Sequence, residues 1–211
     1  MKKVLIVQPI HESGIQVFGD EFDVRVASDP SVETIKKEIK GVAGVVVRTA
    51  PFTREIIETA DSLQVIARHG VGVDNIDIPT ATEKGIFVVN TPTANAVSVA
   101  EHTLVVMGAL AKQLIYMDAA TRNDNWEARN EYKAVDLSGK TLGLVGVGRI
   151  GSMVAKKAQA AFDMQVIAFD PYIKREVAES AKIGLYDDVD EIFRRADVIS
   201  FHTPLTPETK G

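Results

Sequence analysis

The sequence predicts an α/β fold made of two doubly wound parallel sheets, and three observations support this. Short apolar segments rich in β-branched residues alternate with helical patterns along most of the 211 residues. The connections are short, as they are where each helix crosses back to start a parallel strand. The alternation is interrupted once, near residues 92–98, where a long apolar helical pattern begins. We therefore expect two domains, residues 1–97 and residues 98–211.

The first domain is expected to contain five strands separated by four helices. The strands are predicted at residues 4–7, 22–27, 42–47, 63–67 and 86–89, and the helices at 13–18, 31–40, 53–60 and 78–84. The segment 42–47 is almost entirely valine and is apolar on both faces, which is typical of a central strand in a parallel sheet. Gly85 follows the last helix as a stop signal.

The second domain begins with one long apolar helix, predicted from Val97 to about Met117. A polar segment, 123–133, follows it and carries the only tryptophan, Trp126. Strands are then predicted at 141–145, 165–169, 183–185 and 198–201, with helices at 152–162, 175–182 and 189–195. A doubly wound dinucleotide domain has about six strands. With about four, the second domain is expected to be incomplete.

One segment of the second domain has a recognisable chemistry. The strand at 141–145 runs into the sequence G-V-G-R-I-G, at 146–151, and a helix follows. Gly146 permits a tight turn, Gly148 leaves room for a pyrophosphate, and Gly151 lets the helix pack closely on the strand. Asp170 ends the next strand, about 20 residues beyond the last glycine, where a carboxylate accepts ribose hydroxyl protons. This order of elements favours a dinucleotide site over a purely structural turn.

The composition narrows the classes of partner. The net charge of -5 and the lack of a lysine or arginine cluster argue against nucleic acid and anionic membranes as partners. No cysteine is present, so disulfides and thiolate metal sites are impossible. The four histidines show no metal-ligand spacing, so no metal site is expected. A soluble, cytoplasmic protein is the default expectation.

Two arginines are candidates for binding an anionic substrate. Arg48 and Arg68 each end a predicted strand, at the edge where open α/β sheets bind ligands. The segment R-H-G-V-G-V-D-N, 68–75, contains two glycines whose neighbouring amides could point at a carboxylate. The alternative is an ordinary turn into the next helix, with Asp74 or Asn75 as its N-cap.

Four motifs occur together: the glycine motif, R-H-G-V-G-V-D-N, N-T-P-T-A-N-A-V-S-V-A-E-H and D-V-I-S-F-H-T-P-L-T-P-E-T. With them the whole chain resembles the D-isomer-specific 2-hydroxyacid dehydrogenases, nearest to the phosphoglycerate-oxidising branch. The resemblance implies a flavodoxin-like substrate domain followed by a Rossmann domain that binds NAD. It also implies hydride transfer between NAD(H) and a small 2-hydroxy or 2-keto acid.

The resemblance also assigns roles to individual residues. The pyrophosphate would be held by Gly146, Gly148, Arg149, Ile150 and Gly151. Asp170 would bind the adenosine ribose and exclude NADP, whereas His202, Thr203 and Pro204 would line the nicotinamide side. Val71 and Gly72 would offer amides to the substrate carboxylate, and Arg48 and Arg68 would bind a distal phosphate. The long helix 97–117 and the region of Trp126 would form a homodimer or higher homo-oligomer.

The implied substrate pair is 3-phosphoglycerate and 3-phosphohydroxypyruvate, of serine biosynthesis. His69 stands where the resemblance leads us to expect a small residue, so hydroxypyruvate or glyoxylate reduction is the alternative. The family's catalytic arginine, glutamate and histidine match no residue before Gly211, and the C-terminal segment that returns to the first domain is also unmatched. The chain is therefore expected to be truncated and inactive alone. A second alternative is a non-catalytic, NAD-binding dimerising module.

Overall fold

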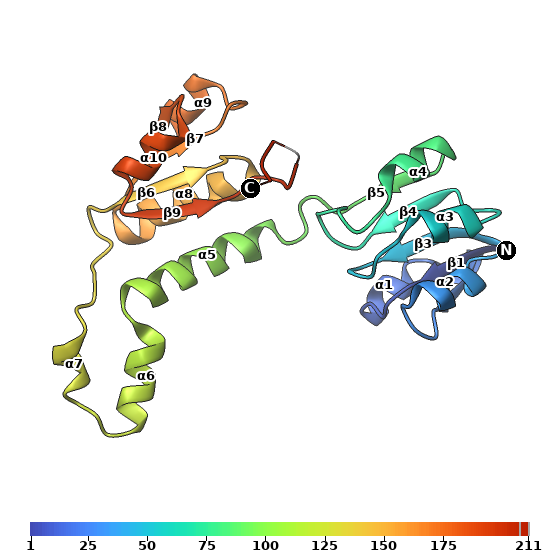
Figure 1. Ribbon diagram of the computed structural model, residues 1–211, viewed down its shortest axis with the longest axis horizontal. Coiled ribbons are helices and arrows are strands. Elements are labelled where there is room, and N and C mark those ends of the chain that lie inside the picture. The colour runs from blue at the N-terminus through green and yellow to red at the C-terminus, as the bar shows by residue number, and fades with distance from the viewer. Residues whose placement is uncertain (207, 211) are drawn as a thin grey trace. The chain divides into compact units, whose positions relative to one another are not determined.

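The protein is described by a computed structural model that covers residues 1–206 and 208–210 (Figure 1). The chain divides into two compact units between Asn95 and Ala96. Unit 1 is the part before this point and unit 2 the part after it. Each contains one parallel sheet with its own helices.

Unit 1 has a five-stranded parallel sheet in the order β2-β1-β3-β4-β5. This is the flavodoxin-like order, and it confirms the predicted fold class. The elements are β1 (Lys2–Ile6), α1 (Glu12–Gln16), the 3₁₀ helix η1 (Gly19–Glu21), β2 (Phe22–Val26), α2 (Val32–Glu38), β3 (Val42–Val47), α3 (Arg54–Thr59), β4 (Val65–Arg68), α4 (Ile78–Glu83) and β5 (Phe87–Val89).

Helices α2 and α4 of unit 1 begin at side-chain caps. Ser31 Oγ accepts the Thr34 N–H at 3.4 Å and starts α2 where the sequence predicted. Asp77 accepts the Thr80 N–H at 2.9 Å and starts α4. Asp74 and Asn75, the alternatives offered by the sequence, are therefore not the cap of this helix. The side chain of Asn75 has other partners, described below.

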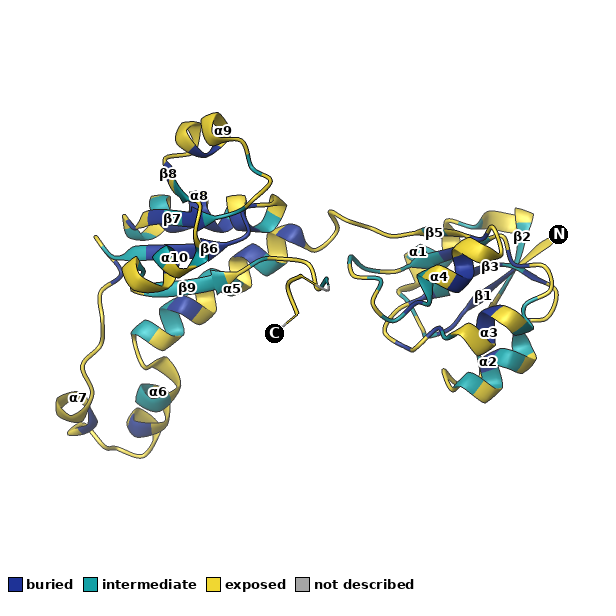
Figure 2. Cartoon of the chain, turned by 45° about the horizontal axis from the view of Figure 1, so that its top comes forward, coloured by how far each residue is buried: buried dark blue, intermediate teal, exposed yellow. Residues whose placement is uncertain are grey.

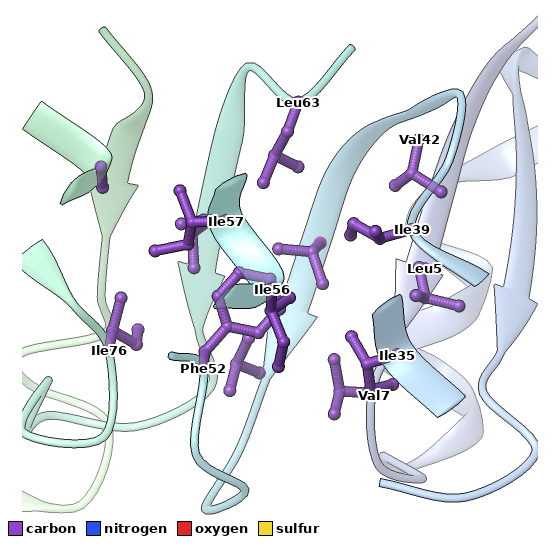
Figure 3. Close-up of a cluster of buried hydrophobic side chains, with 14 of the residues drawn as sticks. Leu5, Val7, Ile35, Ile39, Val42, Phe52, Ile56, Ile57, Leu63 and Ile76 are labelled. Atoms are coloured by element: carbon purple, nitrogen blue, oxygen red, sulfur yellow. The ribbon is translucent and has the colours of Figure 1, made fainter. Parts of the chain in front are cut away.

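The core of unit 1 lies between the sheet and the helices α2, α3 and α4 (Figure 3). Ile35, Ile56 and Ile57 point from the helices toward Val45 and Val47 of the central strand, and all are almost completely buried. Phe52 is fully buried at the end of this core. None of the residues of α1, all of which are described, is buried. The opposite face of the sheet is thus less well covered.

Unit 2 has a four-stranded parallel sheet in the order β8-β7-β6-β9. This corresponds to the order 3-2-1-4 of a doubly wound dinucleotide domain. The elements are α5 (Ala96–Ala111), α6 (Leu114–Arg122), α7 (Ala128–Glu131), β6 (Thr141–Val145), α8 (Arg149–Phe162), β7 (Gln165–Phe169), α9 (Arg175–Ser180), β8 (Ile183–Tyr186), α10 (Val189–Arg195) and β9 (Val198–Phe201).

Small residues let the helices of unit 2 approach its sheet closely. α8 buries Gly151, Val154, Ala155 and Ala158 and packs against β6, β7 and α5. On β6, a Cβ at Gly143 would lie only 2.5 Å from Ile192 Cγ2 of α10. The central strand β6 is therefore packed against both α8 and α10.

The prediction of one long helix from Val97 to Met117 is wrong. The structure has two helices, α5 and α6, bent by 60° at a break after Ala111. The Ala111 carbonyl accepts the Val135 N–H at 2.8 Å, which replaces the bond that would continue the helix. Lys112 Nζ also bonds Asp136 Oδ1 at 2.5 Å, and Gln113 adopts a left-handed conformation with φ 51°. The returning chain thus ends α5.

Helices α6 and α7 lie away from the sheet of unit 2 in both views (Figure 1 and Figure 2). Tyr116 of α6 donates to Glu131 Oε2 of α7 at 2.8 Å and stacks on Tyr132 with ring centroids 4.3 Å apart. Among the described residues, no single helix is long and apolar enough to cross a membrane, although the bent pair α5 and α6 together has the length and composition.

Candidate functional site

The first glycine of G-V-G-R-I-G forms the turn that leaves β6. Gly146 has φ 92°, a conformation that favours glycine, and its N–H donates to the Phe169 carbonyl at 2.9 Å. A Cβ at this position would lie 2.9 Å from the His202 carbonyl oxygen. Gly146 therefore allows three segments, the ends of β6, β7 and β9, to meet at one edge of the sheet.

The other two glycines have different roles at the start of α8. A Cβ at Gly148 would meet no atom within 4 Å, so the space above it is open to a ligand. A Cβ at Gly151 would instead overlap the Gly146 carbonyl. Within the described chain, the N–H groups of Gly148 and Ile150 donate to no acceptor. These donors and the positive end of the helix dipole make the start of α8 suitable for an anion.

Asp170 ties the glycine loop to the segment that follows β7. Its Oδ2 accepts the Val147 N–H at 2.7 Å, and its Oδ1 accepts the N–H groups of Tyr172 and Ile173 at 2.9 and 3.2 Å. The two oxygens offer about four lone pairs. The carboxylate therefore fixes both loops and keeps acceptor capacity on Oδ2 for a ribose hydroxyl.

A pocket of about 560 Å³ opens beside these residues within unit 2. Its lining includes Gly146, Gly148, Asp170, His202, Thr203 and Pro204. His202 is fixed by its backbone N–H, which donates to the Val145 carbonyl at 2.8 Å, and its Nε2 lies 3.0 Å from Ser200 Oγ. Burial lowers the pKa of His202, so its imidazole is neutral at pH 7. Six of the nine predicted cofactor residues thus line one pocket, whereas Arg149, Ile150 and Gly151 do not.

A larger groove of about 1060 Å³ lies on the same unit, between α8 and strands β7 and β8. Its side-chain amide Gln159 Nε2 already donates to the carbonyls of Ala181 and Lys182, at 3.2 and 2.9 Å. None of the three glycines of the motif lines this groove. The smaller pocket is therefore the better candidate for a site.

Arg48 and Arg68 lie at the carboxyl edge of the sheet of unit 1. Val47 and Arg68 are register partners in the β3–β4 pair, and Arg48 comes one residue later. Arg48 Nη1 donates to the Pro9 carbonyl at 2.8 Å, and Arg68 Nη1 donates to the His69 carbonyl. Among the described residues, no carboxylate pairs with either guanidinium. Both arginines therefore retain donors for an anionic ligand.

The loop after β4 is the segment predicted to bind a carboxylate through its backbone amides. The carbonyls of Gly70 and Val71 are held by neighbouring groups, because the first accepts the Thr91 N–H at 3.0 Å and the second accepts Asn90 Nδ2 at 2.6 Å. Within the described chain, the N–H groups of Val71 and Gly72 have no acceptor. Gly70 has φ 149°, and a Cβ there would overlap the Arg68 guanidinium. This residue must be glycine for Arg68 to keep its position.

The supporting role of two residues, which hold the loop of residues 48–50 after β3, could not be recognised from the sequence. Gln8 and Asn75 bind the backbone of residues 48–50 through their side-chain amides. They are 41 and 25 residues away from their partners. Gln8 lies outside the four motifs, and the sequence suggests only a helix cap for Asn75, the last residue of R-H-G-V-G-V-D-N. No group of three or more His, Cys, Asp or Glu residues in the described part of the chain could hold a metal ion.

Two proteins with similar sequences share one name. The chain is 46% identical over 211 residues to D-3-phosphoglycerate dehydrogenase of Methanocaldococcus jannaschii, and the match covers all of this chain but 40% of the relative. It is 39% identical to the enzyme of the same name from Archaeoglobus fulgidus, with coverage of 99% and 40%. The chain thus spans about 40% of the length of these relatives.

Solved structures also resemble the chain. A D-lactate dehydrogenase from Aquifex aeolicus, complexed with NAD and lactic acid, matches with a TM-score of 0.88 at 30% identity, over 99% of this chain and 62% of that one. An NAD⁺-bound 3-phosphoglycerate dehydrogenase from Entamoeba histolytica matches with a TM-score of 0.81 at 30% identity, over 100% and 65%. The family described as D-isomer specific 2-hydroxyacid dehydrogenase, catalytic domain, matches residues 4–203, and the chain belongs to this family.

Proposed function

We propose that this protein acts as an NAD-dependent oxidoreductase that moves a hydride between NAD(H) and C2 of a D-2-hydroxy or 2-keto acid. One observation carries the proposal: the Asp170 carboxylate binds the Val147 N–H of the glycine loop at 2.7 Å, beside the open space above Gly148. A ribose acceptor and a pyrophosphate site therefore lie next to each other, as a dinucleotide requires.

The cofactor contacts follow from this arrangement. The pyrophosphate binds at the start of α8, where Gly146, Gly148 and Gly151 shape the loop and Arg149 and Ile150 form the first turn. The unpaired N–H groups of Gly148 and Ile150 donate to its oxygens. Asp170 accepts from the adenosine ribose, and its charge repels a 2′-phosphate, which favours NAD over NADP.

The nicotinamide is expected on the other side of the same pocket. His202, Thr203 and Pro204 line the pocket, and a Cβ at Gly146 would lie 2.9 Å from the His202 carbonyl oxygen. Because the His202 imidazole is half-buried and neutral, it adds no charge beside the ring. The positively charged form of the nicotinamide therefore meets no additional cation from this residue.

The substrate is proposed to be 3-phosphoglycerate or 3-phosphohydroxypyruvate. The Val71 and Gly72 amides would bind its carboxylate, and Arg48 and Arg68 its distal phosphate. Two guanidinium groups that have no acidic partner among the described residues suit a dianion better than an uncharged hydroxymethyl group. His69 is exposed, and its backbone carbonyl accepts from Arg68 Nη1. The names of the relatives from Methanocaldococcus and Archaeoglobus agree with this choice.

Cofactor binding is tested by titrating the purified 211-residue chain with NADH and NADPH and following nicotinamide fluorescence. NADH should bind at least tenfold more tightly than NADPH, because the Asp170 carboxylate opposes the extra phosphate. Equal affinities, or no binding of either nucleotide, would disprove the proposed cofactor site.

The chain alone should bind these ligands but transfer hydride slowly. Among the described residues, no histidine is paired with a carboxylate, the arrangement that tunes an acid-base group. A positioned general acid-base contributes roughly 10²–10⁴-fold to a rate. Reduction of NAD by 3-phosphoglycerate, and oxidation of NADH by hydroxypyruvate and glyoxylate, should therefore be near background. Rapid turnover of any of them would contradict this.

We also propose that helices α5 and α6 contact a second copy of the chain. Their exposed residues include Leu110, 71% exposed, and Ile115, 84% exposed. An apolar surface of this kind marks an interaction site. Sedimentation should show a dimer for the wild type and a monomer for Ile115→Glu. Val17→Glu in unit 1, at a residue also 84% exposed, is the control and should remain dimeric. A monomeric wild type would refute this proposal.

A further inference from the structure

The loop of residues 48–50, which carries Arg48, is held by a side-chain amide from the end of β1. Gln8 Oε1 accepts the N–H groups of Thr49 and Ala50, both at 2.8 Å. Gln8 Nε2 donates to Thr49 Oγ1 at 3.1 Å. One side chain thus satisfies two successive backbone donors and one hydroxyl, which fixes the direction in which the chain leaves β3.

A second side-chain amide holds the same loop through its carbonyls. Asn75 Nδ2 donates to the Ala50 carbonyl at 2.7 Å and to the Arg48 carbonyl at 3.4 Å. The backbone of Asn75 is itself anchored, since its carbonyl accepts the Phe52 N–H at 2.7 Å. Phe52 is fully buried, so the asparagine is fixed to the core of unit 1.

The two amides serve opposite sides of the loop. Gln8 supplies an acceptor to the N–H groups, and Asn75 supplies a donor to the carbonyls. Both residues are half-buried. Their bonds to Ala50 are partly buried, which limits the ability of water to replace them, whereas their bonds to Arg48 and Thr49 are exposed. The tip of Arg48 completes the arrangement, because its Nη1 donates to the carbonyl of Pro9, the residue after Gln8. Both ends of Arg48 therefore depend on this region.

We propose that Gln8 and Asn75 are positioning residues that clamp the 48–50 loop and direct the Arg48 guanidinium to the distal phosphate of the substrate. The proposal rests on the substrate proposed above. Neither residue touches the substrate itself. Their effect is to fix the backbone from which Arg48 extends, so that less conformational freedom is lost when the phosphate binds.

The clamp is tested without ligand by amide hydrogen exchange in the 211-residue chain. In Gln8→Leu, the amides of Thr49 and Ala50 should exchange at least tenfold faster, because both lose their acceptor, and the amides of β3 should be unchanged. Gln8→Glu keeps an acceptor oxygen and should retain the protection even if Gln8→Leu folds poorly. Gln64→Leu is the matched control, since this exposed amide only accepts from Lys2 Nζ at 3.0 Å. Unchanged exchange at Thr49 and Ala50 in Gln8→Leu would overturn the clamp.

The link to Arg48 is tested by comparing the affinities of 3-phosphoglycerate and D-glycerate, which lacks the phosphate. Gln8→Leu and Asn75→Ala should each weaken 3-phosphoglycerate binding roughly tenfold, the effect of misplacing one charge-assisted contact, and leave D-glycerate binding unchanged. In an Arg48→Ala background, neither change should weaken 3-phosphoglycerate further. An equal loss for both ligands, or a full additional loss in that background, would refute the positioning role.

The two proposals fail in different ways. If the wild type binds 3-phosphoglycerate and D-glycerate equally well, the proposed substrate is wrong and so is the role in directing Arg48 to a phosphate. Hydrogen exchange then still decides whether Gln8 and Asn75 clamp the loop. If the wild type prefers 3-phosphoglycerate and the variants keep that preference, the substrate proposal stands and the positioning proposal is wrong.

Discussion

Replacing Asp170 by asparagine should weaken NADH binding for two reasons: a contact with the ribose is weakened, and the backbone around the cofactor site loses part of its support. The carboxylate accepts three backbone N–H groups, from Val147 at 2.7 Å, Tyr172 at 2.9 Å and Ile173 at 3.2 Å. Asparagine has the same shape but only one acceptor oxygen. Whichever way its amide turns, an NH₂ group faces an N–H group on one side. Either the glycine loop or the Tyr172 segment then loses its anchor.

The size of the effect follows from the bonds that are lost. Hydrogen bonds to charged groups contribute about 1.5–3 kcal/mol, and the half-buried position of Asp170 places its bonds near the lower end of this range. A loss of about 1.5 kcal/mol corresponds to roughly tenfold weaker NADH binding. Because the negative charge that repels the 2′-phosphate is also removed, the preference for NADH over NADPH should decrease as well.

The assay is a fluorescence titration of Asp170→Asn with NADH and NADPH. Asp163→Asn is the control, since it removes the same charge from an exposed residue that ends α8 in a left-handed conformation, φ 52°. The control should bind both nucleotides as the wild type does. Unchanged NADH affinity in Asp170→Asn would refute the argument that this carboxylate organises the glycine loop.

Three further changes test other parts of the structure. Gly151→Ala should lower the unfolding free energy by about 1–3 kcal/mol, because its Cβ would overlap the Gly146 carbonyl. Gly148→Ala should keep the wild-type stability, because its Cβ meets no atom within 4 Å, but should bind NADH more weakly. Thermal melts and NADH titrations distinguish the two variants. Phe52→Ala should cost about 3–5 kcal/mol in urea unfolding, since this ring is fully buried. Burial lowers the pKa of His202, so the unfolded state binds more protons below pH 6.5 and stability should fall as the pH decreases through this window. His202→Gln should flatten that dependence in urea titrations between pH 7 and 5, and an unchanged slope would contradict this cause.

Much of the fold could be predicted from local sequence patterns. The alternation of strands and helices gave two parallel sheets, because each right-handed crossover limits where the next strand can lie. The glycine motif and Asp170 predicted a dinucleotide site because their spacing follows from the geometry of one strand, one helix and the next strand. Gly146, Gly148 and Asp170 line one pocket. Ser31 identified the start of α2 for a similarly local reason.

Features set by contacts distant in sequence could not be predicted. The break after Ala111 contains neither glycine nor proline, and depends on the return of Val135, 24 residues later. The cap of α4 was misassigned because Asp74, Asn75 and Asp77 are all good cap residues, and only the fold shows that Asn75 turns toward Ala50. The role of Gln8 likewise appears only when β1 and β3 lie side by side.

The most direct test of the account is to map NAD onto the backbone amides of the isotope-labelled chain by NMR. Chemical-shift changes should be confined to residues 146–151, 170–173 and 202–204, with the largest at the N–H groups of Gly148 and Ile150. Changes in the larger groove around Gln159 and Lys182, or none at saturating NAD, would contradict it.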